Sequence, residues 1–572
     1  MIGEYWPWSQ PSGSLADFQP LLPAEAEVVA HLSSGDFDRV GDGSRPETDE
    51  PARRIRASFL RFLILGGDEN SRPHEKGIRL SGAWITGVLD LEACRTFRDI
   101  GLKDCRFDSV PVLRSAIINR VFLDGSSLPG LQAERLEVRG GLYLRGAKVT
   151  GEVNLVSSRL GGNVECDGAL IEVPRGGVAV WAESVEARSI LFRGAEIRGG
   201  VNLSGADLQA DLDLAGAKVA RPGDVAINVV AIEVAGSVVL RSAAVEGEVR
   251  MTGSRVGADM DFTAATVANA GKAAVDMSRT TVTGAFFLRK GAAIDGLLDM
   301  SGASVGTIHD EQACWPGRGD LALNRCQYGA FIDGPVRARE RLDWLSRQTP
   351  ERWKEDFWPQ PYEQLANVFQ HMGHDEDARA VLIVKERLQR RARRQRARNP
   401  VILWWRRVLD WVLAVTIAYG RQPLLAFVWL TLFWLIGVGV FWFGERHSTF
   451  KPNSAVVLRS PEWNLCGMPT TEQRFLASTQ AMAYGRAAEG QTQLNCFREQ
   501  WEAASYPELV PPMYSLDTLL PVLDMDQKSY WRPDPSKPYG RMVLAYFYFQ
   551  SVIGWALSLL AVAGFSGLVK SR

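Results

Sequence analysis

Carboxylates recur at regular positions in the first half of the chain and are its best candidates for acid–base chemistry. They fall at outward-pointing positions of a repeated sequence block. Rows of carboxylates on a β-helix act as general acids and bases in some polysaccharide-cleaving enzymes. Such rows also keep the outer face of a sheet soluble, and we favour this structural role. The aspartates concerned are Asp211, Asp213, Asp259, Asp261 and Asp299.

Two histidines near the middle of the chain are candidate metal ligands. His371 and His374 are three residues apart, and two acidic residues follow them. The spacing matches no zinc-protease motif, so we favour solvated histidines at a helix end. The chain also lacks the glycine motifs of dinucleotide and P-loop nucleotide sites and the serine motif of hydrolases. We therefore predict no cofactor, and the catalytic residues remain unassigned.

Two of the seven cysteines stand apart from the others. Cys466 and Cys496 are the only cysteines between the two apolar stretches of the C-terminal part. Because an even pair in an oxidising compartment favours a disulfide, we predict that these two are bonded. The other thiols have irregular spacings that indicate no zinc site, and we expect them to be reduced: Cys94, Cys105, Cys166, Cys314 and Cys326.

A dense run of arginines precedes the first apolar stretch. Beside a membrane span, attraction to anionic lipid head groups, about 1 kcal/mol per basic residue, is the simplest explanation. Nucleic-acid binding is the alternative, but a net charge of −1 does not favour a general polyanion-binding protein. The basic cluster comprises Arg390, Arg391, Arg393, Arg394, Arg396, Arg398, Arg406 and Arg407.

The composition of the 572-residue chain averages over unlike parts. A mean hydropathy of −0.09 is typical of a soluble protein. Nevertheless, residues 424–443 carry no charge, and the same is true of 28 consecutive residues from Met542. Both stretches reach the ~20 residues that span a bilayer core. We predict transmembrane helices over 424–443 and 541–569; two buried core helices are the alternative.

The distribution of basic residues predicts the orientation of these spans. Arginines precede the first span and Lys570 and Arg572 follow the second, so both termini are expected in the cytoplasm. Residues 444–540 would then form an extracytoplasmic loop domain. Asp517 and Asp524, in a segment rich in aromatics and prolines, are the acids we would test first there. We expect a structural role for them.

The sequence between Lys76 and Gly306 is self-similar with a period of 11 residues. Positions 3, 5 and 10 of each block are apolar, and positions 7 and 8 are small, as in the block GGLYLRGAKVT that begins at Gly140. Groups of three blocks restart every 48 residues. Apolar residues two apart indicate a strand with one buried face, and the small pair indicates a tight corner.

These features predict a mainly β protein, a right-handed parallel β-helix, or solenoid, over residues 76–330. An 11-residue period is also compatible with a helical coiled coil, but the glycines and β-branched residues disfavour helix. A propeller is the alternative. Two coils of ~24 residues per 48-residue repeat give nine or ten coils.

A solenoid exposes strand edges at both ends, so we expect helical caps. The N-terminal cap would occupy residues 1–75, with helices over 23–32 and 50–65. A helical hairpin region over 331–400 would follow the solenoid, and an interfacial helix over 401–423 would precede the first span. The predicted helices of the hairpin region are 337–345, 361–371 and 376–398.

Several stretches carry a resemblance to a known group of proteins. They include LLPAEAEVV, VNLSGADLQADLDLAGAKV, WPQPYEQLANVFQHMGHDEDARAVLIVKERLQRR and YSLDTLLPVLDMDQKSYW. The layout resembles bacterial pentapeptide-repeat-like membrane proteins that are often labelled membrane-associated oxidoreductases. The resemblance implies a location in the bacterial inner membrane and, by that label, an oxidoreductase. No catalytic residues come with it.

Three functional hypotheses follow. The first is a membrane-anchored cytoplasmic scaffold or sensor whose solenoid face binds a protein partner, with anionic lipids as further partners and no nucleic acid. The second is a membrane-associated enzyme acting in redox or saccharide chemistry. The third is an oligomeric pore or effector, which would require homo-oligomers; the absence of charges within the spans counts against it.

Overall fold

The computed structural model describes residues 13–395, 411–412, 415–416, 424–467, 493–500, 503 and 505–565. The chain divides into two compact units, Met1–Lys385 and Glu386–Arg572. The first unit is the solenoid with its two caps. The second contains the apolar helices.

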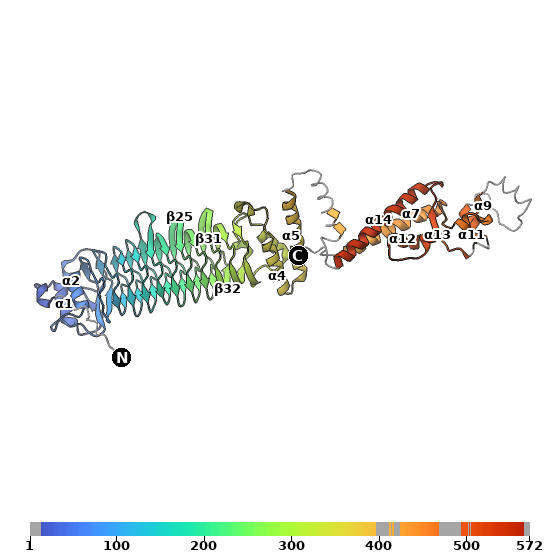
Figure 1. Cartoon of the computed structure of the whole chain (residues 1–572). Coiled ribbons are helices and arrows are strands. Elements are labelled where there is room, and N and C mark those ends of the chain that lie inside the picture. Colours follow the sequence, from blue (N-terminus) through green and yellow to red (C-terminus); the bar gives the residue numbers. More distant parts are fainter. Residues whose placement is uncertain are drawn as a thin grey trace, which may run out of the picture. The chain divides into compact units, whose positions relative to one another are not determined.

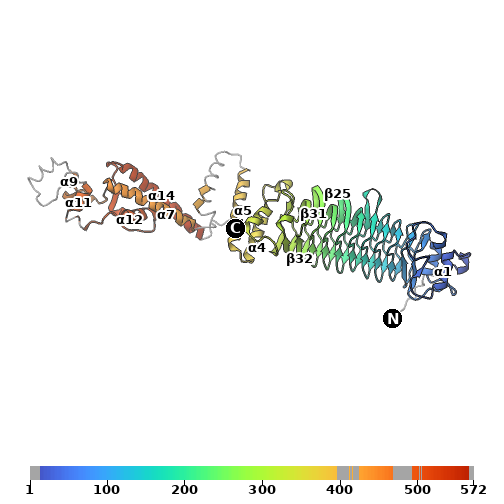
Figure 2. The ribbon, with the colours of Figure 1, turned by 180° about the vertical axis from the view of Figure 1, so that it is seen from behind.

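The first unit is a parallel β-solenoid of about 12 turns, as the sequence predicted. Figures 1 and 2 show its stacked coils from two sides. A typical turn has four short strands, one for each side. They are β11 (Glu137–Val138), β12 (Leu142–Tyr143), β13 (Lys148–Val149) and β14 (Val153–Asn154). Each strand pairs in parallel with its equivalents in the turns before and after.

The number of turns exceeds the predicted nine or ten because the stack continues beyond the repeated sequence, which ends at Gly306, to Phe331, and because the early turns are short. Ile78 pairs with Ile100, Ile100 with Val121, and Val121 with Leu142, so each of these turns uses less chain than the predicted average. With ~4.8 Å between neighbouring strands, the stack is roughly 50–55 Å long.

The small residues of each block form the corners of the solenoid. At block position 7, Gly146 and Gly168 have φ angles of 63°, and Ser157 has 56°. The backbone N–H of Ala147 donates to the Leu144 carbonyl over 3.1 Å, which closes a four-residue turn. Because a left-handed third residue is a feature of type II turns, glycine is favoured at this position. Ala147, next in the chain, is buried inside the corner.

The 48-residue repeat arises from two turns of unequal length. Val164 pairs with Ile190 and Ile190 with Leu212, so that a long turn is followed by a shorter one. The additional residues of the long turns form loops that project from one corner, within β25 (Lys218–Asn228) and β31 (Thr266–Asp276). Both strands are labelled along one edge of the solenoid in Figure 1.

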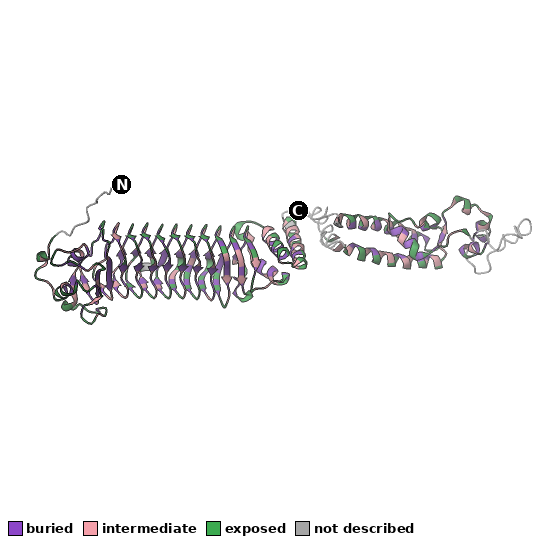
Figure 3. Cartoon of the chain, turned by 90° about the horizontal axis from the view of Figure 1, so that it is seen from below, coloured by how far each residue is buried: buried purple, intermediate pink, exposed green. Residues whose placement is uncertain are grey.

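The core of the first unit is an aliphatic column along the solenoid axis, visible as a continuous buried interior in Figure 3. Leu142, Leu144 and Val149, at the three apolar positions of their block, are each no more than 1% exposed. Stacking such residues over successive turns supplies the hydrophobic stabilisation that holds the turns together.

The N-terminal cap closes the first turn with strands as well as helices. Its helices are α1 (Pro23–His31) and α2 (Ala57–Ile64). The helix predicted over 50–65 is wrong in its first half, because Arg54–Arg56 is a strand, β2, that pairs with β4 (Trp84–Thr86). The buried carboxylate of Glu25 in α1 accepts bonds from the backbone N and the guanidinium of Arg56. The cap therefore supplies hydrogen-bond partners for the strand edge that the first turn would otherwise expose.

The C-terminal cap is helical, as expected. The first two helices cover the last strand, β36 (Gln327–Phe331), through side-chain bonds to its carbonyl groups and through aromatic contacts. Gly373, with φ of 83°, separates the second helix from the third. The three helices are α3 (Ala338–Leu345), α4 (Gln360–His371) and α5 (Asp375–Gln395).

The second unit is built on two long apolar helices, α7 (Leu425–Arg446) and α14 (Gly540–Phe565). Both are long and apolar enough to cross a membrane. A third helix, α12 (Pro511–Leu519), packs against both. The remaining described elements are α8 (Ala455–Leu458), α9 (Pro461–Gly467), α11 (Gln493–Arg498), α13 (Gln527–Tyr530) and the antiparallel strands β37 (Phe450–Pro452) and β38 (Trp531–Pro533).

Candidate functional site

The aspartates of the repeat are engaged in backbone hydrogen bonds. The side chains of Asp213, Asp261 and Asp299 each accept a bond from the backbone N–H two residues later, over 2.8–2.9 Å. This arrangement is an Asx turn, which bends the chain from a strand into the next corner. Asn202 bonds the N–H of Ser204 in the same way. The role of these three aspartates is therefore structural.

Asp211 and Asp259 link neighbouring turns. Asp211 accepts a 2.8 Å bond from the backbone N–H of Ser237, and Asp259 accepts one of the same length from Ala285. The preceding residue in each case, Gly236 for the first pair, has no room for a side chain beside the carboxylate. Each of these two carboxylates therefore bonds the backbone of the next turn, and in both cases one long turn separates the bonded residues in the sequence.

The structure does not gather the five aspartates into one site. Asp213 and Asp261 lie on one side of the solenoid, separated by Val239 of the intervening turn. Asp299 lies on another side, directly beside Asp276 of the previous turn. Sequence reasoning missed this second carboxylate, although its position two residues before a corner is that of the other Asx turns.

Burial raises the pKa of the Asp299 carboxyl, and the neighbouring carboxylate of Asp276 adds to the rise. Both side chains still accept a bond from the backbone N–H two residues on, at 3.0 Å for Ser278 and 2.8 Å for Ser301. This stacked pair is the strongest local accumulation of negative charge that we find among the five aspartates and their neighbours.

The two histidines lie where α4 ends and α5 begins. His371 is exposed in the last turn of α4, and the His374 ring lies edge-on to Phe369, 6.2 Å between centroids. In the described part of the chain, no group of three or more histidine, cysteine, aspartate or glutamate side chains is placed to hold a metal ion. The structure thus places these histidines at a helix end without bringing a third ligand to them.

The basic cluster is only partly within the described residues. Arg390, Arg391 and Arg393 lie on α5, where Arg390 forms a 2.7 Å ion pair with Glu386. The side chain of Arg394 and the residues Arg396, Arg398, Arg406 and Arg407 lie outside the described residues, as does most of the predicted interfacial helix.

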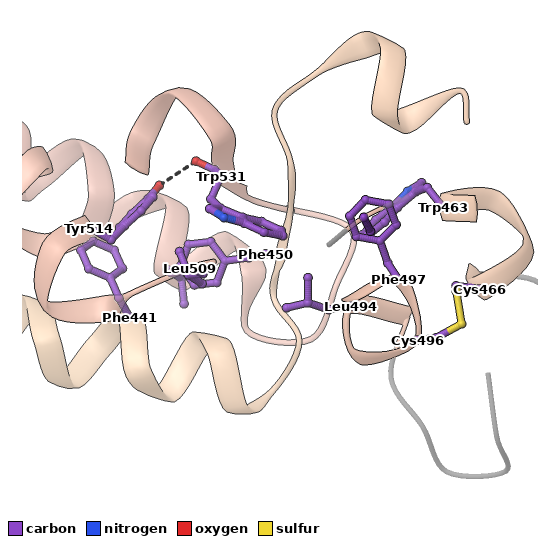
Figure 4. Close-up of a cluster of buried hydrophobic side chains, with 12 residues drawn as sticks. Phe441, Phe450, Trp463, Cys466, Leu494, Cys496, Phe497, Leu509, Tyr514 and Trp531 are labelled. Atoms are coloured by element: carbon purple, nitrogen blue, oxygen red, sulfur yellow. Dashed lines mark hydrogen bonds between the residues drawn. A yellow bond between two sulfur atoms is a disulfide. The ribbon is translucent and has the colours of Figure 1, made fainter. Parts of the chain in front are cut away.

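In the second unit, Cys466 and Cys496 are joined in a disulfide. Figure 4 shows the bond at one end of a cluster of buried side chains that includes Trp463 and Phe497, with Tyr514 at the other end. The Tyr514 hydroxyl donates to the Trp531 carbonyl over 3.2 Å. The disulfide therefore links α9 to α11 at one end of this cluster.

Asp517 is buried and bonds the chain that follows α12. Its side chain accepts from the backbone N–H groups of Met525 and Lys528 at 3.2 and 2.9 Å, and it forms a 3.1 Å ion pair with the Lys528 ammonium. Asp524 is exposed and bonds the backbone N–H of Asp526 over 3.2 Å. These contacts assign both acids to the local structure of this loop.

One side of the solenoid presents a ladder of charged side chains that sequence reasoning did not single out. The residues stack at equivalent positions of successive turns, and an arginine lies on either side of three consecutive acidic residues. Arg159 pairs with Glu186 over 3.3 Å, and Arg255 pairs with Glu233 of the previous turn. We call this row the charge ladder; its members are Glu137, Arg159, Glu186, Asp207, Glu233 and Arg255.

An open depression of about 570 Å³ lies along the first part of the charge ladder. Its wall contains Phe97, which is 43% exposed and lies 4.4 Å beneath the Arg139 guanidinium. Arg159 and Glu186 also line it. Aromatic rings and arginines are side chains in which protein interfaces are enriched.

Comparison with protein families and with curated proteins gives no relative of this chain. No protein-family model matches the chain, and a search of curated proteins found no match. The functional proposal therefore rests on the residues of this chain.

Proposed function

We propose that the chain is a membrane-anchored scaffold whose solenoid binds a protein partner along the charge ladder. The observation that carries this proposal is the ladder itself, a rigid row of exposed charges with the depression at Phe97 beside it. Strand stacking fixes the spacing of the row at ~4.8 Å per turn. A partner with complementary charges at that spacing would gain specificity from its register.

Anchoring by the second unit is supported by the surface of its two long helices. Both α7 and α14 are long and apolar enough to cross a membrane. Large apolar side chains are exposed along both helices, among them Phe427, Leu435, Val552 and Leu559. A face of this kind is stable where hydrocarbon covers it.

The orientation in the membrane follows from charge. The arginines before α7 and the basic residues at the C-terminus favour a cytoplasmic location for both segments, and the disulfide would then lie on the opposite, oxidising side. By resemblance, the membrane is the bacterial inner membrane. The arginines of the basic cluster would contact anionic head groups there.

Reversal of charge on the ladder tests the proposal. Protein carrying Arg159→Glu and Arg255→Glu is purified from native membranes beside the wild type, and co-purifying proteins are compared by mass spectrometry. The control is Arg145→Glu with Arg193→Glu, because these arginines pair with Asp124 and Asp167 away from the ladder. We expect a partner that is retained by wild type and control and reduced at least tenfold by the ladder variant.

Two results would contradict a scaffold. Equal loss of the partner in the control would show that the ladder is not the binding surface. An absorbing cofactor together with substrate turnover would instead favour the enzyme hypothesis, in agreement with the oxidoreductase label of the resembling proteins.

A further inference from the structure

Helix α12 forms a polar junction with the middle of the two apolar helices. The Ser515 hydroxyl donates to the carbonyl of Trp434 in α7 over 2.9 Å. The side-chain amide of Gln550, a buried residue of α14, donates to the Ser515 hydroxyl over 2.8 Å. One short helix therefore bonds both apolar helices near the midpoint of α7.

Glycines allow this close approach. A Cβ atom at Gly554 of α14 would lie 1.8 Å from the Leu519 carbonyl oxygen, and one at Gly437 of α7 would lie 2.2 Å from the Ser515 hydroxyl oxygen. Small residues at helix contacts, together with side-chain hydrogen bonds, are the usual means by which helices associate inside membranes.

The depth of α12 follows from its contacts. Leu519 packs with Leu430 of α7 and Leu557 of α14. The distance from Leu430 to Arg446, the charged end of α7, is about 24 Å along a helix that is about 33 Å long. The hydrocarbon core of a bilayer is ~30 Å thick. If α7 spans it, α12 reaches beyond the middle.

The turn after α12 exposes apolar side chains at this depth. Val522 is 91% exposed, and Leu523 is also exposed. Side chains of the long helices, such as Leu432 and Val552, are exposed as well. Hydrocarbon is the solvent that such exposed apolar side chains fit.

Two of the three residues that follow Leu523 are acidic rather than apolar. Asp524 and Asp526 are exposed, while Asp517 is paired with Lys528. Ionised carboxylates at membrane depth face water or protein rather than lipid. The non-helical backbone of this turn has the same requirement, so only the apolar side chains of Val522 and Leu523 can reach lipid. The apolar side chains of Val522 and Leu523 and the carboxylates of Asp524 and Asp526 therefore require different surroundings.

We infer that residues 510–527 form a re-entrant segment, which enters the membrane beside α7 and α14, contacts lipid acyl chains through Val522 and Leu523, and lines a water-filled recess with Asp524 and Asp526. The inference rests on the proposed membrane anchoring. It changes the predicted extracytoplasmic loop 444–540, part of which would lie within the membrane. It also places carboxylates at membrane depth, which the two uncharged stretches do not supply.

Spin labels on single introduced cysteines measure the depth. The full-length protein is reconstituted in phosphatidylcholine–phosphatidylglycerol vesicles, and collisions with oxygen and with a water-soluble nickel chelate are compared at V522C and D524C. V552C, on the exposed face of α14, is the lipid control, and V456C, at an 80% exposed position of the short helix α8, is the water control. Labelling of wild-type protein gives the background from native cysteines.

We expect the V522C label to match V552C, with oxygen collisions dominant, and the D524C label to be at least fivefold more accessible to nickel than V522C. A V522C label that behaves as V456C would overturn the inference while leaving the anchoring intact. Nickel access at V552C would instead overturn the anchoring. A V522C label shielded from both reagents would place a second copy of the chain there and overturn the lipid contact, and L523C gives an independent measurement of each outcome.

Discussion

The guanidinium of Arg341 and the carboxylate of Asp310 form a bidentate ion pair, with N–O distances of 2.6 and 2.7 Å. Both side chains are buried, Asp310 at the end of a solenoid strand and Arg341 on α3 of the C-terminal cap. The Trp315 indole donates to the same carboxylate over 2.7 Å, and the guanidinium lies 3.6 Å from the centroid of the Phe331 ring. The pair thus attaches the cap to the last turns.

Replacement of Arg341 by alanine should detach this cap. Removing one partner leaves the buried Asp310 carboxylate uncompensated, and such changes cost about 3–5 kcal/mol. We expect a clear fall in the thermal midpoint of the detergent-solubilised protein, together with protease cleavage near residue 335. Circular dichroism and limited proteolysis measure the two effects.

Arg318→Ala is the matched control for this prediction. Arg318 forms a 3.2 Å ion pair with Asp343 but is largely exposed, so its loss should cost about 0–1 kcal/mol. Equal stability of the Arg341 and Arg318 variants would show that the cap does not depend on the buried pair.

Gly247→Ala should disturb the solenoid at one of its projecting loops. Gly247 has φ of 127°, and a Cβ atom there would lie 2.5 Å from the Arg221 carbonyl oxygen. Gly253→Ala is the control, because its φ of 71° resembles that of corner residues such as Ser242, and open space surrounds it. We expect about 1–2 kcal/mol for the control, from backbone strain alone, and a larger loss for Gly247. Thermal unfolding compares the two, and equal midpoints would contradict the steric explanation.

The solenoid could be predicted because its fold is repeated locally in the sequence. Each block repeats the same apolar positions and the same corner, so the fold can be predicted even where one block departs from the pattern. Gly146 and Ala147 illustrate this, since their left-handed turn recurs with little change along the solenoid. The alternation of long and short turns was not predicted, because the length of the larger repeat fixes only the sum of two turns.

The charge ladder depends on the alternation of long and short turns, and sequence analysis therefore did not predict it. Arg159 and Glu186 are neighbours only because a long turn separates them, and the period of the short blocks does not reveal that spacing. The position of α12 was missed for another reason. Its sequence resembles an ordinary loop, and only the contacts of Ser515 with Trp434 and Gln550 place it between the apolar helices.

Native thiols should be inert toward maleimides. Cys105, Cys166 and Cys326 are buried, and burial raises the pKa of each thiol to about 12. At pH 7.5 the reactive thiolate is then on the order of 1 part in 10⁴ to 10⁵. We expect no labelling of the folded protein within an hour, five labelled cysteines in detergent-denatured protein, and seven after reduction, counted by mass spectrometry.

The V456C variant provides a reactive thiol as the control for that measurement, because Val456 is highly exposed. A native cysteine that reacts at the rate of V456C in folded protein would contradict the buried thiols. Seven labels in denatured, unreduced protein would contradict the Cys466–Cys496 disulfide.

Asp299→Asn should stabilise the protein at neutral pH and lose this effect in acid. The pKa of Asp299 is raised above its ordinary value of 3.8, chiefly by burial and further by Asp276. A carboxyl with a raised folded-state pKa stabilises the fold when protonated, fully below the unfolded value, and this contribution is lost as the pH rises through the folded-state pKa. Asparagine retains the oxygen that accepts from the Ser301 N–H.

The thermal midpoint of the Asp299→Asn variant should therefore exceed that of the wild type at pH 7, and the difference should shrink below pH 4. Asp213→Asn is the matched control, because Asp213 makes the equivalent bond and its neighbours in the adjacent turns, Leu191 and Val239, are uncharged. A difference for Asp299 that is constant from pH 3.5 to 7 would mean that the carboxylate charge does not destabilise this part of the solenoid.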